Sequence, residues 1–193
     1  MTKRVLIAYG TRFGSTEEIS RKFAELMRIQ GLDATVINVK KDKCPPLGQF
    51  DAVLIGSGIK MGRWTKEAKN FMKKNAKALK EKAFLAIFVS SGDASYPEKY
   101  QKAKEKYVQK IITELGFDLN SVMQEAFGGL FDLSNTSRMG RMDKMFTNMA
   151  ARDDESANLT ENAYNDLRDW GQIHSFANEA ATRIIQNEKK VMK

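Results

Sequence analysis

The chain has 193 residues, of which 42% are hydrophobic and 29% are charged, and this composition excludes the disordered class because it can supply a buried core. We expect neither a transmembrane helix nor a signal peptide, because no apolar run approaches about 20 residues and the first one begins already at Val5. The single cysteine, Cys44, rules out an internal disulfide. These features predict a cytoplasmic protein, with peripheral contact at the inner face of the membrane as an open alternative.

The formal net charge is +8, from 32 basic and 24 acidic residues, and it bears on partners more than on the fold. Nine basic and only two acidic residues fall between Lys60 and Lys82. An acidic redox protein or an anionic membrane surface would suit this charge, and so would a merely solvated helix face. No nucleic-acid-binding module is recognisable, so nucleic acid is not expected as a partner, and no feature specifies an oligomeric state.

The segment 4–16 has the pattern of a buried strand that leads through a short loop into a helix. Its apolar run ends at Gly10, small and hydroxyl residues follow, and a helical pattern begins at Glu17. The first N–H groups of a helix have no partners inside the helix and carry partial positive charge, so this arrangement suits a phosphate-sized anion. Gly14 would allow the backbone to approach the anion closely. Hydroxyl donors would come from the loop side chains Thr11, Ser15 and Thr16.

Two common phosphate-binding patterns are absent from this loop. A Walker A loop carries a lysine before its Ser/Thr, whereas Gly14 precedes Ser15 here, and no G-x-G-x-x-G pattern follows the strand. The segment from Thr11 to Thr16 instead resembles the T-x-x-G-S/T-T loop that holds the phosphate of FMN in flavodoxins. A plain Gly/Ser/Thr turn that caps the helix is the alternative interpretation.

The remaining pattern alternates strands with helices, which predicts a parallel sheet covered by helices on both faces. Strands are predicted at 5–9, 34–39, 52–55, 84–89 and 122–131, the last interrupted by Gly128-Gly129. Helices are predicted at 17–30, 66–79, 97–115 and 165–188. We expect one domain, 1–193, with an insertion at 132–162 between the fifth strand and the last helix.

The expected strand order is 2-1-3-4-5, which flavodoxins share with response regulators. Response regulators need an acidic residue at the end of the third strand, where this chain has Gly56-Ser57. The predicted architecture is therefore a flavodoxin-like three-layer α/β fold with a five-stranded parallel sheet.

Residues 92–96, Gly-Asp-Ala-Ser-Tyr, resemble the G-D-x-x-Y loop that follows the fourth strand of flavodoxins. The resemblance implies that this loop's backbone binds the polar edge of a flavin and that Tyr96 stacks on its ring. The loop from Gly58 to Trp64 would form the second wall, where Trp64 either covers the other ring face or anchors the following helix. Gly58 or Gly62 would allow the peptide flip that accompanies flavin reduction in flavodoxins.

Four segments, spread over essentially the whole chain, resemble the menaquinone-dependent protoporphyrinogen oxidases: 11–16, 56–62, 143–146 and 169–173. The resemblance implies an FMN-dependent oxidoreductase that passes electrons to a quinone-type acceptor. A non-catalytic FMN electron carrier that docks an acidic redox partner is the alternative. Because the flavin would carry the chemistry, no catalytic side chain is assigned, and no metal site is expected. The implied FMN site consists of Thr11, Arg12, Phe13, Gly14, Ser15, Thr16, Ser57, Gly58, Ile59, Lys60, Met61, Gly62, Trp64, Ser90, Ser91, Gly92, Asp93 and Tyr96.

The insertion contains a helical stripe of apolar side chains with basic residues beside it. The stripe consists of Met139, Met142, Met145, Phe146 and Met149. The basic residues are Arg138, Arg141 and Lys144. A basic amphipathic helix at 138–149 suits contact with a membrane interface or an adaptable protein groove. Packing over the flavin domain's own edge as a lid is the alternative.

Three cationic residues, Arg12, Lys60 and Arg63, fall in the predicted flavin loops. Positive charge near a flavin favours its reduced, anionic form. We therefore expect a higher two-electron potential than in a flavodoxin whose flavin has acidic surroundings, which favours hydride or quinone chemistry over low-potential one-electron transfer.

Overall fold

A computed structural model of the chain, which describes residues 2–134, 138–152 and 159–186, contains a five-stranded parallel sheet. The strand order is β2-β1-β3-β4-β5, which confirms the predicted order and fold class. The strands are β1 (Arg4–Gly10), β2 (Asp33–Asn38), β3 (Ala52–Gly58), β4 (Phe84–Ser90) and β5 (Val122–Phe127). All seven residues of β4 are buried, as expected for a central parallel strand that is covered on both faces.

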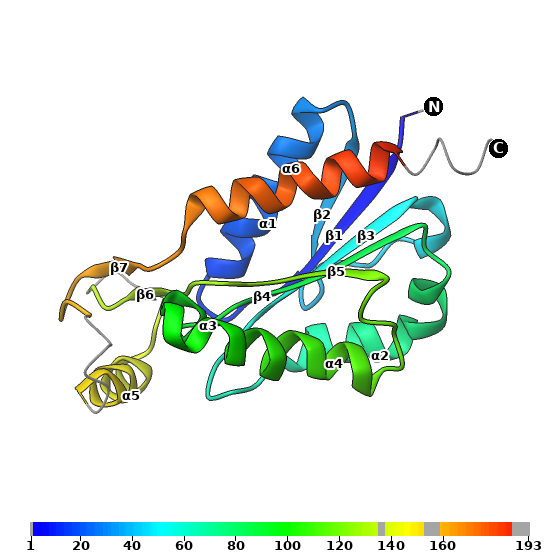
Figure 1. Cartoon of the computed structure of the whole chain (residues 1–193). Helices are drawn as coiled ribbons and strands as arrows, with labels where there is room; N and C mark the ends of the chain where they lie inside the picture. Colours follow the sequence, from blue (N-terminus) through cyan, green and yellow to red (C-terminus); the bar gives the residue numbers. More distant parts are fainter. Residues whose placement is uncertain (1, 135–137, 153–158, 187–193) are drawn as a thin grey trace.

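Helices cover both faces of the sheet (Figure 1). On one face lie α1 (Ser15–Ile29) and α6 (Trp170–Gln186). On the other lie α2 (Lys66–Lys80), α3 (Pro97–Lys104) and α4 (Lys110–Glu114), the last two joined by a π-helical turn, Glu105–Gln109. Alternate residues of each strand enter two separate hydrophobic clusters, one under each helical layer, because successive side chains of a strand point to opposite faces.

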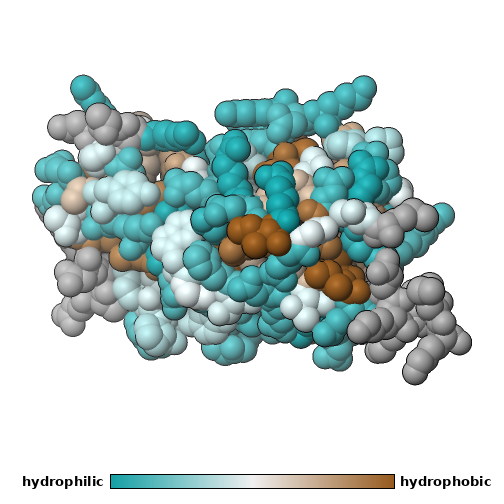
Figure 2. All heavy atoms as spheres, turned by 90° about the horizontal axis from the view of Figure 1, so that it is seen from above, coloured by the Kyte–Doolittle hydropathy of each residue, from teal (hydrophilic) through white to brown (hydrophobic). Residues whose placement is uncertain are grey.

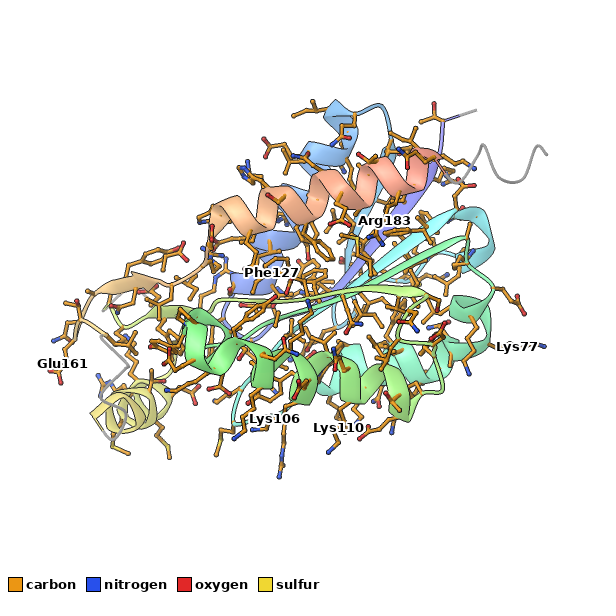
Figure 3. The ribbon with its side chains drawn as sticks, in the orientation of Figure 1. Lys77, Lys106, Lys110, Phe127, Glu161 and Arg183 are labelled. Carbon is orange, nitrogen blue, oxygen red and sulfur yellow. The ribbon has the colours of Figure 1, made fainter. Side chains whose placement is uncertain are left out.

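The core beneath α1 and α6 is built around four phenylalanine rings, Phe23, Phe88, Phe127 and Phe176. Their centroids lie 5.0–6.0 Å apart, mostly edge to face. Figure 3 shows Phe127 between the sheet and α6. The outer surface of this layer is largely hydrophilic, with small separate hydrophobic patches (Figure 2). Among the described helices, none is long and apolar enough to cross a bilayer.

The strand predicted at 122–131 is shorter than expected, because the chain leaves the sheet at Gly128-Gly129. A Cβ atom on Gly128 would lie 2.1 Å from the Leu167 carbonyl oxygen, and one on Gly129 would lie 3.0 Å from the Gly92 nitrogen. Three backbone segments therefore meet here, at a distance that only glycine allows. Beyond this point β6 (Leu130–Asp132) pairs antiparallel with β7 (Tyr164–Asp166).

The last helix also begins later than predicted, at Trp170 rather than residue 165, because residues 164–166 belong to the β6–β7 hairpin. The Asp169 carboxylate accepts a hydrogen bond of 3.1 Å from the Gln172 backbone N–H and so caps the helix. The predicted end at residue 188 lies outside the described residues.

The insertion adds the β6–β7 hairpin and α5 (Arg141–Arg152) at the edge of the sheet where the parallel strands end (Figure 1). This is the edge at which open α/β sheets bind their ligands.

Candidate functional site

A cavity of about 590 Å³ opens at the carboxyl edge of the sheet, a volume in the range of ligand pockets. Its walls come from the loops that follow β1, β3 and β4, and from the insertion. The residues predicted for the site line this cavity, except Gly14, Ser57 and Trp64. The cavity lies where β1 and β3 are neighbours, which is the topological switch point of this strand order.

The loop between β1 and α1 makes a tight turn at Gly14, directly before the first turn of α1. Gly14 has a φ of 107°, in the left-handed region, and its N–H donates to Thr11 Oγ1 at 3.0 Å. Ser15 Oγ lies 2.7 Å from Ser90 Oγ, which links this loop to the end of β4. Gly14 thus shapes the turn from behind the cavity wall, while the hydroxyl residues face it.

The Thr16 hydroxyl is the most informative atom of the loop. Its residue is fully buried and lines the cavity, yet Oγ1 has no hydrogen-bond partner among the described residues. Leaving a buried hydroxyl without a partner costs about 1–3 kcal/mol. A phosphate at the N-terminus of α1 would accept this hydrogen bond together with those of the first helical turn, so the residues present fit a phosphate monoester.

The loop after β3 is a tight two-residue turn at the mouth of the cavity. Lys60 N–H donates to Arg63 O at 3.1 Å, and Arg63 N–H donates back to Lys60 O at 3.0 Å. Met61 and Gly62, with φ of 49° and 71°, give the turn two left-handed residues, as in a type I′ turn. Met61 therefore sits at the tip and is 87% exposed.

The Arg12 guanidinium holds this turn in place. It donates to the carbonyl oxygens of Gly58 at 3.3 Å, Arg63 at 3.3 Å and Trp64 at 3.1 Å. Burial lowers the pKa of Arg12, while Glu67 and Asp143 act in the opposite direction. The Arg12 guanidinium thus donates these three hydrogen bonds to backbone carbonyl oxygens of the loop. This role was not predicted from the sequence.

Trp64 and Ser57 lie outside the cavity for identifiable reasons. The Trp64 indole N–H donates to the Tyr107 carbonyl oxygen at 2.7 Å, in the π-helical turn, and its ring packs against the core under α2. Of the two alternatives for Trp64, this geometry matches the anchoring one. The Ser57 hydroxyl is fully buried and accepts from the Thr65 backbone N–H at 3.0 Å, at the start of α2.

The loop after β4 brings Asp93 and Tyr96 to the cavity wall. Gly92 packs under the Phe131 ring so closely that a Cβ there would lie 2.6 Å from the ring. Lys99 lies over one face of the Tyr96 ring, with its Nζ 4.8 Å from the ring centroid. The Asp93 carboxylate accepts a hydrogen bond of 2.5 Å from the Tyr107 hydroxyl.

The sequence predicted a further cavity wall only as one alternative, a lid formed by the helix at 138–149, and through the segment 143–146, which resembles the oxidases. The wall also includes residues at the end of the strand predicted at 122–131. Its residues are Gly129, Leu130, Phe131, Met139, Asp143, Thr147 and Leu159. Asp143 forms an ion pair with Lys60 and so joins α5 to the turn after β3. The Lys60 charge is therefore matched by a carboxylate, and Arg63 is exposed outside the cavity, which weakens the positive flavin environment that the sequence predicted.

The methionines expected to form one apolar stripe on the insertion helix differ in burial. Met139 is buried and lines the cavity, which matches a lid. Met142 and Met145 are 68% and 57% exposed. The side chains of Phe146 and Met149 lie outside the described residues.

Tyr107→Phe is expected to lower stability by about 0.5–1.5 kcal/mol, because the buried Tyr107 side chain loses its hydrogen bond to the Asp93 carboxylate, which is exposed and can be solvated instead. Burial, and then the hydrogen bond to Asp93, raise the pKa of Tyr107 above its ordinary 10.0, so the phenol stays protonated at neutral pH. A group whose pKa is raised on folding contributes stability below pH 10.0 and loses it as the pH rises through the folded value. Urea unfolding from pH 7 to 11 should therefore show a difference that shrinks in alkali; a constant difference would contradict this role.

Arg168 is a second residue that the sequence did not reveal. Its side chain is only 1% exposed and forms ion pairs with Asp166 at 2.7 Å and Glu18 at 2.8 Å. It also donates to the Ser15 carbonyl oxygen at 3.4 Å, so it ties the β6–β7 hairpin to the first turn of α1. Burial alone would raise the pKa of Asp166, but the hydrogen bonds from Arg168 outweigh it and the pKa is lowered.

Arg168→Met is expected to lower the free energy of unfolding by about 1–3 kcal/mol at pH 7, because two neighbouring carboxylates lose the cation that they share. The loss is limited to this range because both carboxylates are partly exposed to solvent. A lowered carboxyl pKa contributes stability above the ordinary 3.8 and loses it as the pH falls through the folded value. Urea midpoints should thus differ most at neutral pH and converge toward pH 3. Arg183→Met, which breaks an exposed pair with Glu179, is the control and should change stability by less than about 0.5 kcal/mol.

Comparison with known proteins agrees with this architecture. The chain is 31% identical over 111 residues to protoporphyrinogen IX dehydrogenase (quinone) of Escherichia coli strain K12, and the match covers 56% of this chain and 60% of that protein. Rubredoxin oxygen:oxidoreductase from Desulfovibrio gigas superposes with a TM-score of 0.55 and 17% identity, covering 96% of this chain and 37% of that one. A flavodoxin of Streptococcus pneumoniae superposes with a TM-score of 0.52 and 16% identity, covering 93% and 99%.

The two structural matches show a shared fold alone, at their level of identity. The match to the curated relative spans about 60% of its length. Residues 6–157, most of the chain, match the family model described as a flavodoxin domain (Flavodoxin_5). The chain therefore belongs to the flavodoxin domain family.

Proposed function

We propose that the cavity binds FMN and that the protein is an oxidoreductase passing electrons to a quinone-type acceptor. The observation that carries FMN binding is the buried hydroxyl of Thr16, which lines the cavity at the N-terminus of α1 and has no hydrogen-bond partner in the part of the chain that the structure describes. A phosphate monoester supplies the missing acceptor, and flavodoxin-domain proteins are the family to which the chain belongs.

In this proposal the loop 11–16 binds the phosphate, and the loops after β3 and β4 hold the ring. Tyr96 offers an aromatic face, and the backbone around Ser91 and Gly92 offers polar groups to the ring edge. FMN, when bound, supplies the capacity to accept and donate one or two electrons. The protein's share of the work is to orient the ring, exclude water from it and set the charge around it.

A quinone-type acceptor is supported by the wall that the insertion builds. Leu130, Phe131, Met139 and Leu159 contribute apolar side chains to the lining of the cavity. A flat, weakly polar ring suits such a wall, because ligand pockets are lined mainly by apolar and aromatic side chains that bury the ligand. The similarity to a protoporphyrinogen IX dehydrogenase (quinone) supports protoporphyrinogen as the electron donor.

The second candidate function is a non-catalytic FMN electron carrier that docks an acidic redox protein. It is favoured by the lysine face, which we define as the exposed residues Lys66, Lys73, Lys77 and Lys80 of α2 with Lys106 and Lys110 of the neighbouring helix. Figure 3 shows Lys106 and Lys110 pointing away from the sheet. Such a surface accelerates encounter with an acidic partner, and the effect falls with salt.

Anaerobic turnover of protoporphyrinogen with a water-soluble menaquinone analogue separates the two candidates. The oxidoreductase predicts formation of fluorescent protoporphyrin in proportion to the FMN-loaded protein, and none with the FMN-free protein. Met139→Gln, which puts a polar group into the apolar wall, should raise KM for the quinone with FMN content unchanged, whereas Ile29→Gln, on the exposed end of α1, should change neither. No turnover with any quinone, together with salt-sensitive reduction by a ferredoxin-type protein, would favour the carrier.

A further inference from the structure

Three exposed methionines lie on elements that contribute to the cavity, one on the turn after β3 and two on α5. Met61, at the tip of the turn after β3, is 87% exposed, and Met142 and Met145 of α5 are 68% and 57% exposed. A single exposed apolar side chain such as Ile29 is ordinary on a protein surface, whereas a group of them beside a cavity is typical of contact with a partner or a membrane. We call these three residues the rim patch.

The ion pair between Lys60 and Asp143 brings the members of the rim patch together, although they come from distant parts of the chain. Lys60 precedes Met61, and Asp143 follows Met142. On α5 the side chains of Asp143 and Thr147, four residues apart, line the cavity. Met142 and Met145, three residues apart, share a different face of the helix and are exposed there. The helix thus covers the cavity with one face and presents thioethers to solvent with another.

Cationic side chains surround the rim patch. Arg63 and Arg141 are exposed next to it in the chain, and neither forms an ion pair with another residue in the described part of the structure. Arg138, whose side chain is 70% exposed, lies just before α5 and forms an ion pair with Glu17 at 3.5 Å. Lys106 reaches the turn from the other side, with Nζ 3.8 Å from the position of a Cβ on Gly62. Apolar tips ringed by cations are the surface chemistry of interfacial membrane binding.

Other occupants fit this surface less well. A second copy of the chain would bring another net charge of +8 against the same cations, which disfavours self-association. An acidic protein would pair with the cations, but three exposed thioethers add nothing to such an ionic contact. The lysine face already offers an acidic protein positive charge without exposed methionines. An anionic bilayer uses both features, because the thioethers enter the interface while arginine and lysine contact the headgroups.

We propose that the rim patch and its cations bind the surface of an anionic lipid bilayer, so that the turn after β3, which lines the cavity, lies against the membrane. The inference deepens the proposed function and rests on it in one respect, namely that a lipid-soluble quinone would then enter the cavity from the bilayer without crossing water. Membrane binding itself requires neither turnover nor bound flavin.

Co-sedimentation of the full-length protein with phosphatidylcholine vesicles, with and without phosphatidylglycerol, tests the proposal. We expect binding to the anionic vesicles that weakens as salt is added, and little binding to phosphatidylcholine alone. Replacing Met61, Met142 and Met145 together by glutamine should weaken binding at least about tenfold, because the apolar contribution is lost while every charge remains. Ile29→Gln removes a side chain that is 75% exposed at the far end of α1 and should leave vesicle binding unchanged.

Two results would overturn the proposal: no binding to anionic vesicles at low salt, or binding by the triple methionine variant equal to that of the unaltered protein. The circular dichroism spectrum of the triple variant should match that of the unaltered protein, and a mismatch would call for the single variants, of which Met61→Gln alters only the exposed turn. Vesicle binding without quinone turnover would contradict the proposed function and support the membrane-binding proposal. Quinone turnover without vesicle binding would support the proposed function and contradict the membrane-binding proposal.

Discussion

Thr16→Val is expected to weaken FMN binding about tenfold to a hundredfold without lowering the stability of the FMN-free protein. Valine has nearly the shape of threonine, so the packing at this fully buried position is kept. The FMN-free protein loses a hydroxyl that has no partner among the described residues, which is neutral or slightly stabilising. The FMN complex loses a hydrogen bond to a charged phosphate, a contribution of about 1.5–3 kcal/mol.

Quenching of flavin fluorescence on titration of the FMN-free protein measures the affinity, and urea unfolding measures the stability. Riboflavin, which lacks the phosphate, is the internal control, and its affinity should be the same for both proteins. Thr182→Val, at an exposed position of α6 where the hydroxyl donates to the Asn178 carbonyl oxygen at 2.9 Å, should change neither affinity. An equal loss of FMN and riboflavin affinity in the Thr16 variant would mean that Thr16 does not contact a phosphate.

Phe127→Ala should have the largest effect on stability, a loss of about 3–5 kcal/mol in the free energy of unfolding. The Phe127 ring is completely buried and lies 5.8, 6.0 and 5.5 Å from the rings of Phe23, Phe88 and Phe176. Its removal leaves a cavity at the point where β4, β5, α1 and α6 meet, and the three remaining rings cannot collapse into it without giving up their own contacts.

Urea unfolding followed by circular dichroism measures this loss. Leu119→Ala, at a position that is 36% exposed beyond α4, is the matched truncation and should cost less than about 1 kcal/mol. The Phe127 backbone carbonyl accepts from Ser91 N–H at 3.0 Å, and this bond does not depend on the side chain. The variant should therefore still bind FMN under conditions where it is folded. A loss below about 1.5 kcal/mol would show that the core repacks around the missing ring.

The sheet could be predicted from the sequence because its signals are local and repeated. The apolar runs that form the parallel strands are short and are followed by loops, and the strand order was implied by the resemblance of the loops at 11–16 and 92–96 to those of flavodoxins. The exit from the sheet at Gly128-Gly129 could not be predicted, because two glycines suit a bulge as well as a break. Their contacts with Leu167 and Gly92 decide between the two.

The candidate site shows the same difference between local patterns, which can be predicted from the sequence, and contacts between distant residues, which cannot. The loops at 11–16 and 92–96 carry recognisable patterns, so their residues could be named in advance. The insertion wall could be offered only as an alternative, a lid at 138–149, because it depends on contacts such as Lys60 with Asp143, which lie far apart in the chain. Arg12 lines the cavity and Trp64 does not, and the roles of both depend on which backbone carbonyls their N–H groups reach, which the sequence does not show.

The flavin content of the purified protein is the most direct test of FMN binding. We expect a yellow protein with one FMN per chain, or a colourless protein that quenches FMN fluorescence stoichiometrically and binds riboflavin more weakly. A colourless protein that quenches neither flavin would contradict it.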